Sequence, residues 1–480
     1  MKDMEFDLTK PHCYYFNEIA KIPHGSKNEK RLSDWIVDFA KAHGLRYVQD
    51  DMYNVVIYKD ATKGYEDHPG VIVQAHIDMV CEKTPESTHN FETDPLELYV
   101  EGDHLRAKGT TLGADDGMGC AYMLAILADD TLAHPALECC FTTQEEVGLV
   151  GAQALKPEYF KARRMINLDG AGEIKTYMSM GGGEQVTLHK PIHWQSNAKP
   201  AYRVRIDGLL GGHSGGMIDK ERANAGKLMT RLLAALEREQ ISFEIAAFAG
   251  GTKHNVIMPS AAATIVSDGD ENQIVEILKR CEQAIREEYE LSDPDIRATV
   301  EKTSAERALD PQDSADVLHL AYLLPYGLKA RNLTVADNPP ITSVNLGVIA
   351  VGEEEATFGL SARSALDCAV EELKEEITLL GELYGAKAAF SGWYPGWKYE
   401  AKSEIREIMK RVYFDIYGKP LNCLIGHGGN ECGVFKRMFP DMDIVTSGAI
   451  YGCIHTPDEF LDLASFDRAW ILLTKLIAAL

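Results

Sequence analysis

Short apolar runs alternate with segments of helical periodicity along the first 170 residues of the chain. Short apolar runs typical of buried strands occupy 54–59, 70–76, 136–143 and 163–169, and the first two are rich in valine and isoleucine. Segments 28–44 and 113–130 place their apolar residues on one helical face, and Asp115 or Asp116 is suited to cap the second helix. Strands that alternate with helices predict an α/β domain with a mainly parallel mixed sheet and helices on both faces.

The pattern changes between roughly 185 and 395, where strand-like runs occur in pairs and long helices are segregated from them. The strand-like runs are 201–209, 242–250, 261–268, 341–352 and 355–365, and the acidic-faced helices are 272–290 and 369–385. This region predicts an α+β domain. A weak internal echo within it leaves open a duplicated ferredoxin-like unit.

The last 80 or so residues return to the first style, with an expected strand at 442–449, a loop at 450–460 and a closing amphipathic helix at 458–480. A chain of 480 residues is too long for one hydrophobic core. The simplest arrangement is a domain built from both chain ends, 1–184 and 396–480, with a lid-like domain, 185–395, inserted between them.

Composition and charge narrow the classes of function. The formal net charge of −24 argues against nucleic-acid binding, because a phosphate backbone would repel such a surface. The N-terminal stretch lacks the apolar core of a secretory signal and no run approaches about 18 apolar residues, so we expect a cytoplasmic protein with no membrane partner. The ten cysteines form no CxxC pair, which favours buried free thiols over a cysteine-zinc site.

Side chains suited to metal binding follow the predicted strands. In the stretch VIVQAHIDMV, His76 and Asp78 lie two positions apart, so they emerge on the same side where the apolar run ends. Functional crevices in open α/β sheets lie outside the carboxyl ends of the strands, so groups at successive strand ends are expected to converge. Glu145, Glu146 and Asp169 lie at other strand ends, His455 lies in the loop after the final strand, and Asp115 and Asp116 lie at the start of a helix.

Six acids and two imidazoles in one crevice would repel one another strongly unless cations neutralised them. Imidazole with carboxylate is the ligand set of catalytic zinc, cobalt or manganese sites. Two such ions, ~3.5–4 Å apart, need one bridging carboxylate and about two further ligands each. The sequence therefore predicts a two-metal site, with at least two acids left for catalysis and support.

Each of these groups also has a purely structural interpretation. A single histidine after a strand is more often structural, paired glutamates are commonly solvated, and paired aspartates before a helix are commonly a cap. His89, His104, His134 and His427 are interpreted as structural in this way. The prediction of a metal site rests on the co-occurrence of suitable groups at consecutive strand ends.

A series of ordered motifs resembles a known family. The motifs are HIDMV (76–80), GTTLGADDGMG (109–119), TTQEEVGLVGA (142–152), NLDG (167–170) and IHTPDE (454–459). They resemble the M20 family of dinuclear zinc peptidases, and within it the aminoacyl-histidine (Xaa-His) dipeptidase branch. The resemblance extends into the inserted domain through GLLGGHSGGMIDKERANA (208–225) and GGTKHNVIMPS (250–260).

The resemblance implies a metal ligand set. Asp115 would bridge two divalent ions, expected to be Zn²⁺ with Co²⁺ or Mn²⁺ as alternatives. His76 and Asp169 would complete one site, and Glu146 and His455 the other. These are five of the residues at strand ends or at the helix start, so the two lines of inference agree.

The resemblance also implies catalytic roles. Asp78 would orient His76 through its far ring nitrogen. Glu145 would act as the general base that takes a proton from water and passes it to the departing amine. The family pattern implies a cis peptide bond between Asp115 and Asp116. One departure is visible, because many members carry lysine after the paired aspartates where this chain reads DDGMG.

Three residues of the inserted domain match positions that contact substrate in the family. His213, on the glycine-rich stretch GGHSGG, would stabilise the oxyanion of the tetrahedral intermediate. Asn255 and Arg363 would contact the substrate, and the planar fork of Arg363 suits a free carboxylate. Because these groups lie on a separate domain, we expect the domains to close on substrate.

The resulting prediction is a metal-dependent dipeptidase acting on small unblocked peptides, broad in specificity and including Xaa-His and β-alanyl-histidine. The alternatives within enzymes are a dizinc aminopeptidase or tripeptidase and an N-acyl amino acid deacylase. A metal-binding sensor that has lost catalysis is the non-enzymatic alternative, and retention of Glu145 argues against it. A homodimer is left open, as is whether His213 serves its own subunit or its partner.

Overall fold

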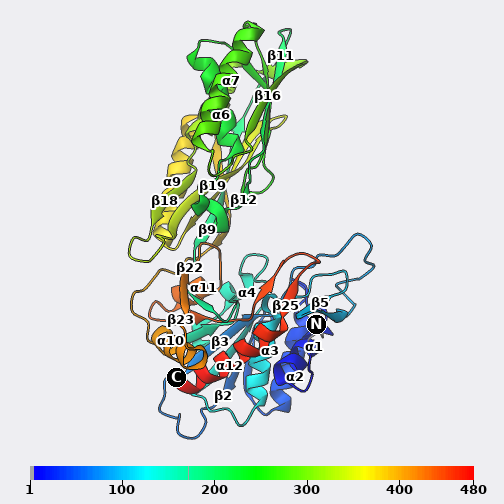
Figure 1. The fold of residues 1–480 in the computed structure, drawn as a ribbon, viewed down its shortest axis with the longest axis vertical. Coiled ribbons are helices and arrows are strands. Elements are labelled where there is room, and N and C mark those ends of the chain that lie inside the picture. The colour runs from blue at the N-terminus through cyan, green and yellow to red at the C-terminus, as the bar shows by residue number, and fades with distance from the viewer. Residues whose placement is uncertain (1–4, 171) are drawn as a thin grey trace. The chain divides into compact units, whose positions relative to one another are not determined.

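The computed structural model describes residues 5–170 and 172–480 (Figure 1). By internal contacts the chain divides into two compact units, and each is described separately. The first unit runs to Met180 and resumes over Trp397–Ile425 and Asn430–Leu480. The second unit comprises Gly181–Gly396 and Gly426–Gly429. The sequence predicted domain boundaries at 184/185 and 395/396, and it did not predict that the chain returns to the second unit at Gly426–Gly429.

A six-stranded mixed sheet lies at the centre of the first unit. Its order is β1-β2-β6-β3-β7-β23, with bounds Arg46–Gln49, Val55–Lys59, Leu137–Thr142, Val71–His76, Arg164–Asn167 and Asp443–Thr446. The four strands from β6 to β23 run parallel, and β1 and β2 are antiparallel additions. Every residue of β3 is buried. The predicted mainly parallel mixed sheet is confirmed.

Helices cover both faces of this sheet. Five helices share one hydrophobic core with alternate residues of β3 and β6: α1 Pro11–Ala20, α2 Lys30–Ala42, α3 Ala114–Ala128, α10 Glu404–Tyr417 and α12 Leu463–Ala479. On the opposite face lie the short helices α4, Val150–Ala154, and α11, Cys432–Met438. The ring of Phe435 on α11 packs against Phe160 there. This arrangement leaves the carboxyl ends of the parallel strands free to present side chains.

Two local expectations are refined by the structure. Near the start of α3, Asp115 and Asp116 have non-helical φ and ψ, and the Asp116 carboxylate caps the regular helix that follows by accepting a hydrogen bond from the Gly119 backbone N–H at 3.2 Å. The closing helix begins at Leu463 rather than at 458, because Phe460–Asp462 form strand β25 instead. That strand belongs to a small sheet of order β24-β25-β5-β4, whose other strands are Tyr451–Gly452, His104–Ala107 and Leu98–Glu101.

A nine-stranded antiparallel sheet forms the second unit. Its order is β16-β11-β15-β13-β19-β20-β9-β21, with β18 paired to β19. The bounds are β9 Gly182–Pro191, β11 Ala201–Asp207, β13 Glu244–Gly250, β15 Ala261–Val266, β16 Arg297–Thr303, β18 Gly327–Arg331, β19 Pro340–Val351, β20 Glu355–Ser364 and β21 Lys387–Tyr394. On β11, Val204 is buried whereas Arg203 and Arg205 are exposed, as expected when one face of a sheet is covered.

The helices α6 Ala225–Arg238, α7 Glu271–Glu288, α8 Pro311–Leu323 and α9 Asp367–Leu383 pack on this sheet (Figure 1). Short pairs complete the strand set. In the first unit, β8 Lys175–Ser179 pairs with β22 Asn422–Ile425, and in the second unit the pairs are β10 Trp194–Ser196 with β17 Arg307–Leu309 and β12 Gly212–His213 with β14 Val256–Ile257. The remaining helical turns are α5 Ser214–Met217 and the 3₁₀ turns Pro157–Tyr159 and Ile218–Lys220.

The order of strands repeats within the second unit. Read from the β16 edge, the sheet begins with β16, β11, β15 and β13, which are fourth, first, third and second of their set in chain order. Read from the β21 edge, it begins with β21, β9, β20 and β19, which are again fourth, first, third and second of their set. The connection from β9 to β19 in the second set contains all four strands of the first set. This order is consistent with a duplicated ferredoxin-like unit, which stays a prediction.

All ten cysteines are free in the part of the chain that the structure describes, and five of them are buried. None of the described helices is long and apolar enough to cross a membrane.

Candidate metal centre

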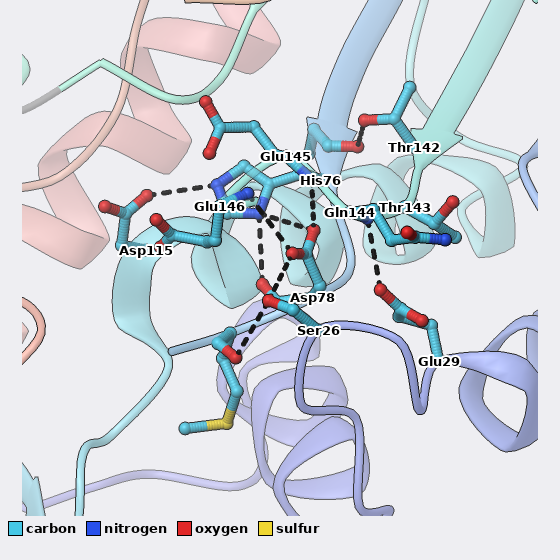
Figure 2. Close-up of polar contacts among 12 residues, drawn as sticks. Ser26, Glu29, His76, Asp78, Asp115, Thr142, Thr143, Gln144, Glu145 and Glu146 are labelled. Carbon is cyan, nitrogen blue, oxygen red and sulfur yellow. Dashed lines mark hydrogen bonds and ion pairs between the residues drawn. The ribbon is translucent and has the colours of Figure 1, made fainter. Parts of the chain in front are cut away.

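The end of β3 holds the first imidazole of the site (Figure 2). His76 is the last residue of the strand, and its Nδ1 lies 3.0 Å from the backbone carbonyl of Asp78 and 3.5 Å from the Asp78 carboxylate. The backbone carbonyl is therefore the nearer partner of Nδ1, whereas the resemblance implied the carboxylate. An Nδ1–H donated to this carbonyl leaves Nε2 as the ring nitrogen with a free lone pair.

The Asp78 carboxylate instead organises the loop that carries the paired glutamates (Figure 2). It accepts hydrogen bonds from the Ser26 hydroxyl at 2.7 Å and from the backbone N–H groups of Glu145 and Glu146 at 2.9 and 3.3 Å. Asp78 is only 1% exposed, so these bonds are made in a buried environment where they are strong. The carboxylate thus ties the end of β3 to the segment after β6.

Asp115 lies between the two imidazoles predicted to bind metal. Its Oδ1 is 3.2 Å from His76 Nε2, and its Oδ2 is 3.8 Å from His455 Nε2. The peptide bond between Asp115 and Asp116 is cis, as the resemblance implied. His455 has a positive φ of 61° in the loop after β24, and its Nε2 also lies 2.9 Å from Glu146 Oε1.

Five predicted ligands form two triads that share Asp115. In each triad, one ligand atom from every residue lies within 4.8 Å of the other two. One triad is His76, Asp115 and Asp169, and the other is Asp115, Glu146 and His455. Glu145 belongs to neither triad, although its carboxylate groups with His76 and Glu146 in the same way.

The charges in this cluster influence one another strongly. Burial raises the pKa of Glu145 well above its usual value, and neighbouring carboxylates add to the effect. The pKa of Asp169 is shifted upward by burial and by Asp115. Burial alone would lower the pKa of His76, but its hydrogen bond to Asp115 helps to raise it well above its usual range. The acids outnumber the imidazoles, so a donor set of this composition fits divalent cations.

Two further residues position the ligands, and neither role was predicted from the sequence. The Glu459 carboxylate accepts hydrogen bonds from the backbone N–H groups of Leu112, Gly113 and Ala114 at 2.8, 3.1 and 2.9 Å. It thereby connects the His455 loop to the residues directly before Asp115. Glu459 is part of the IHTPDE motif, but a motif alone does not show which backbone groups its acid reaches.

Asn430 is the second such residue, and its side-chain N–H group donates to Asp169 Oδ2 at 3.1 Å. The Tyr451 hydroxyl lies 3.4 Å from the other oxygen, Oδ1. Close backbone packing holds the loop after Asp169, because a Cβ on Gly448 would lie 1.8 Å from the Gly170 carbonyl oxygen. Only glycine fits at position 448 without moving this loop.

The three predicted substrate-binding residues all lie within the second unit. Asn255 Nδ2 is 3.5 Å from His213 Nε2; His213 is the last residue of β12, and Asn255 directly precedes β14. Arg363, on β20, is buried and donates from Nη1 to the Tyr394 hydroxyl at 2.5 Å. Burial lowers the pKa of His213, and the Arg363 charge lowers it further.

The histidines interpreted as structural stay outside the two triads. His427 is buried in the second unit, with Nε2 at 2.7 Å from the Ser343 hydroxyl. His134 Nδ1 lies 2.8 Å from the Pro135 carbonyl oxygen. His89 packs edge to face against Phe91, and His104 stacks on Phe460.

An α/β sheet with two histidine–carboxylate triads that share an aspartate is the architecture of a metallopeptidase. The chain matches Peptidase family M20/M25/M40 over residues 72–479 and belongs to that family. It is 35% identical over 468 residues to the cytosol non-specific dipeptidase of Escherichia coli (strain K12), and the alignment covers 96% of both chains.

Solved structures agree with this assignment. The crystal structure of aminoacylhistidine dipeptidase from Vibrio alginolyticus matches 99% of this chain and 98% of that chain, with a TM-score of 0.92 and 33% sequence identity. A tripeptidase from Staphylococcus aureus shares the fold at a TM-score of 0.57 and 16% identity, covering 98% and 97% of the two chains. The family predicted from the motifs is confirmed.

Proposed function

We propose that the protein is a metal-dependent dipeptidase that hydrolyses unblocked dipeptides with broad specificity, including Xaa-His and β-alanyl-histidine. Membership of the peptidase family and the printed names of two similar proteins, a non-specific dipeptidase and an aminoacylhistidine dipeptidase, support this proposal. The observation that carries it is the placement of Asp115 in both triads.

Five residues are proposed to hold two divalent ions. Asp115 is shared, His76 and Asp169 complete one site, and Glu146 and His455 complete the other. We propose Zn²⁺, with Co²⁺ and Mn²⁺ as alternatives, because imidazole with carboxylate suits all three. When bound, such ions would acidify water and polarise a peptide carbonyl.

Glu145 is proposed as the general base. Its backbone N–H is held by Asp78, and its carboxylate lies beside the triads without belonging to either. A carboxylate in that place can accept the proton of the attacking water and deliver it to the departing amine. Glu146, the next residue, takes the ligand role because its Oε1 faces His455 instead.

The residues of the second unit are proposed to bind the substrate. The Nε–H group of Arg363 is buried and has no hydrogen-bond partner within the described part of the chain. A guanidinium with a spare donor suits the free carboxylate of a dipeptide. His213 is proposed to donate to the developing oxyanion, with Asn255 beside it.

Substitution of Glu145 by glutamine tests the proposed base. We expect kcat to fall by a factor of about 10²–10⁴, because glutamine cannot accept the proton. The metal content should stay equal to that of the wild type, since Glu145 is not a proposed ligand. Turnover at the wild-type rate with both ions bound would contradict the role given to Glu145.

A substrate panel separates the dipeptidase from its alternatives. We expect fast cleavage of a dipeptide, slower cleavage of its tripeptide extension and little cleavage of the N-acetylated dipeptide. Preference for the tripeptide would indicate an aminopeptidase or tripeptidase. Preference for the acetylated form would indicate a deacylase, and no cleavage by metal-loaded protein would indicate a sensor.

A cytoplasmic location and a homodimer complete the proposal. The location is proposed because the E. coli relative is named a cytosol dipeptidase. Sedimentation would test the homodimer. If His213 served the partner subunit, mixing the inactive His213→Ala and Glu145→Gln variants would restore part of the activity, whereas service within one subunit would restore none.

A further inference from the structure

A row of buried side-chain amides runs beneath the proposed metal centre, on the face of the sheet that α11 covers. The row joins the Glu431 carboxylate to Asp169 through Gln74, Asn167 and Asn430, which we call the amide chain. The exposed fractions of Gln74 and Asn167 are 0%, and those of Asn430 and Glu431 are 4% and 1%. The amide chain is therefore shielded from water along its whole length.

Each member of the amide chain donates to the next. Gln74 Nε2 donates to Glu431 Oε2 at 2.5 Å, and Asn167 Nδ2 donates to Gln74 Oε1 at 2.7 Å. Asn430 Nδ2 donates to Asn167 Oδ1 at 3.3 Å and to Asp169 Oδ2 at 3.1 Å. An uninterrupted path of hydrogen bonds thus links Glu431 to a proposed metal ligand.

The orientation of Asn430 is determined independently of the metal ligand. Its Oδ1 accepts the backbone N–H of Cys432 at 2.8 Å, a role that only the carbonyl oxygen of the amide can fill. Its NH₂ group must then face Asn167 and Asp169. At the other end, Glu431 Oε2 also accepts the Thr142 hydroxyl at 2.8 Å, which holds the carboxylate in place.

The fold brings these residues together from distant parts of the sequence. Gln74 on β3 is the register partner of Asn167 on β7, so their side chains lie next to each other on one face of the sheet. Asn430 and Glu431 directly precede α11 and reach that face from the helix. Two strands and one helix start therefore define the geometry.

We propose that the amide chain, anchored on Glu431, is a positioning device that sets the rotation of the Asp169 carboxylate for cation binding. Asn430 acts on Asp169 directly, and Gln74 and Asn167 act through Asn430. This inference rests on the proposed function, because it assumes that Asp169 is a metal ligand. Hydrogen bonds to ligating carboxylates commonly change metal affinity by about 10–100-fold when they are removed.

Zinc titration of metal-free protein tests the inference without measuring turnover. In competition with a chromophoric chelator, we expect Asn430→Leu to raise the dissociation constant of one of the two ions by about 10–100-fold. The other ion should bind as in the wild type. Asn332→Leu is the matched control, because Asn332 is a buried residue of the second unit whose side-chain oxygen accepts hydrogen bonds from Thr334, and it should leave both constants unchanged.

A double-mutant cycle tests whether the effect passes along the amide chain. Gln74→Leu should weaken the same ion, and Gln74→Leu added to Asn430→Leu should cause no further loss. Additive losses would overturn transmission through Asn430. If the leucine variant at position 430 does not fold, Asn430→Ala serves in its place, with the melting temperature of the metal-free protein as the check on folding.

The outcomes distinguish this inference from the proposed function. A wild type that binds fewer than two zinc ions would refute the two-metal centre itself. A wild type that binds two ions, together with an Asn430 variant of unchanged affinity for both, would overturn the positioning role and leave the proposed function standing.

Discussion

At the scale of single residues, the side chains proposed as metal ligands could be selected from the sequence, whereas the residues that hold them in place could not. His76 is the last residue of the buried strand β3 and Asp169 follows the end of β7 by two residues, so apolar runs in the sequence locate them. Asn430 donates a hydrogen bond to Asp169, and Glu459 accepts hydrogen bonds from the residues before Asp115. In each pair the two partners lie hundreds of positions apart along the chain. No local pattern encodes such pairs, because they depend on which segments the fold brings together.

His427 provides a test of pH dependence at this scale. Burial and, to a smaller extent, the Arg363 charge lower its pKa to about 3, although Asp219 opposes the shift. In the unfolded chain a histidine has a pKa of about 6.5. Between these values the unfolded state binds a proton that the folded state does not, so the free energy of unfolding decreases as the pH falls from 6.5 towards 3.

We expect the melting temperature of the wild type to fall more steeply between pH 7 and pH 5 than that of His427→Asn. The loss attributable to His427 is about 1 kcal/mol at pH 5.5. Calorimetry of both proteins across this range would measure the difference. Parallel curves would show that His427 becomes protonated in the folded protein as easily as in the unfolded chain.

At the scale of elements, apolar runs predicted most strands near the centre of each sheet. Strand β3 is wholly buried and rich in β-branched residues, a signal that holds whatever surrounds it. The closing helix was wrongly predicted to begin at 458, because the apolar residues of DEFLD continue the helical spacing of the segment that follows. Pairing of β25 with β5 decides its conformation, and that is a tertiary contact.

The end of α8 offers a stability test at this scale. The Lys227 ammonium donates to the backbone carbonyls of Ala321 and Leu324 at 3.0 and 2.8 Å and to that of Tyr322. These are carbonyl groups at the C-terminus of the helix, where a cation is favourable. We expect Lys227→Met to lower the free energy of unfolding by about 2 kcal/mol.

Denaturant unfolding would measure that change, with Lys279→Met on the exposed face of α7 as the control. The control should shift stability by no more than about 0.5 kcal/mol. Equal effects of the two substitutions would show that the three carbonyl contacts contribute nothing.

At the scale of the whole molecule, the prediction of two domains rests on a change in the sequence pattern, from strands that alternate with helices to paired strands with segregated helices. The short return at Gly426–Gly429 was not predictable, because four residues carry no periodicity. The proposed metal centre lies wholly within the first unit, yet its ligands are spread from His76 to His455. Only the folded chain gathers them.

The central claim is that this gathering of acids and imidazoles holds two divalent cations. The most direct test is the metal content of purified, metal-reconstituted protein, paired with dipeptide turnover before and after exhaustive chelation. We predict two ions per chain, loss of turnover on chelation and its recovery when zinc is restored. Trace metal after reconstitution, or full turnover after chelation, would contradict the claim.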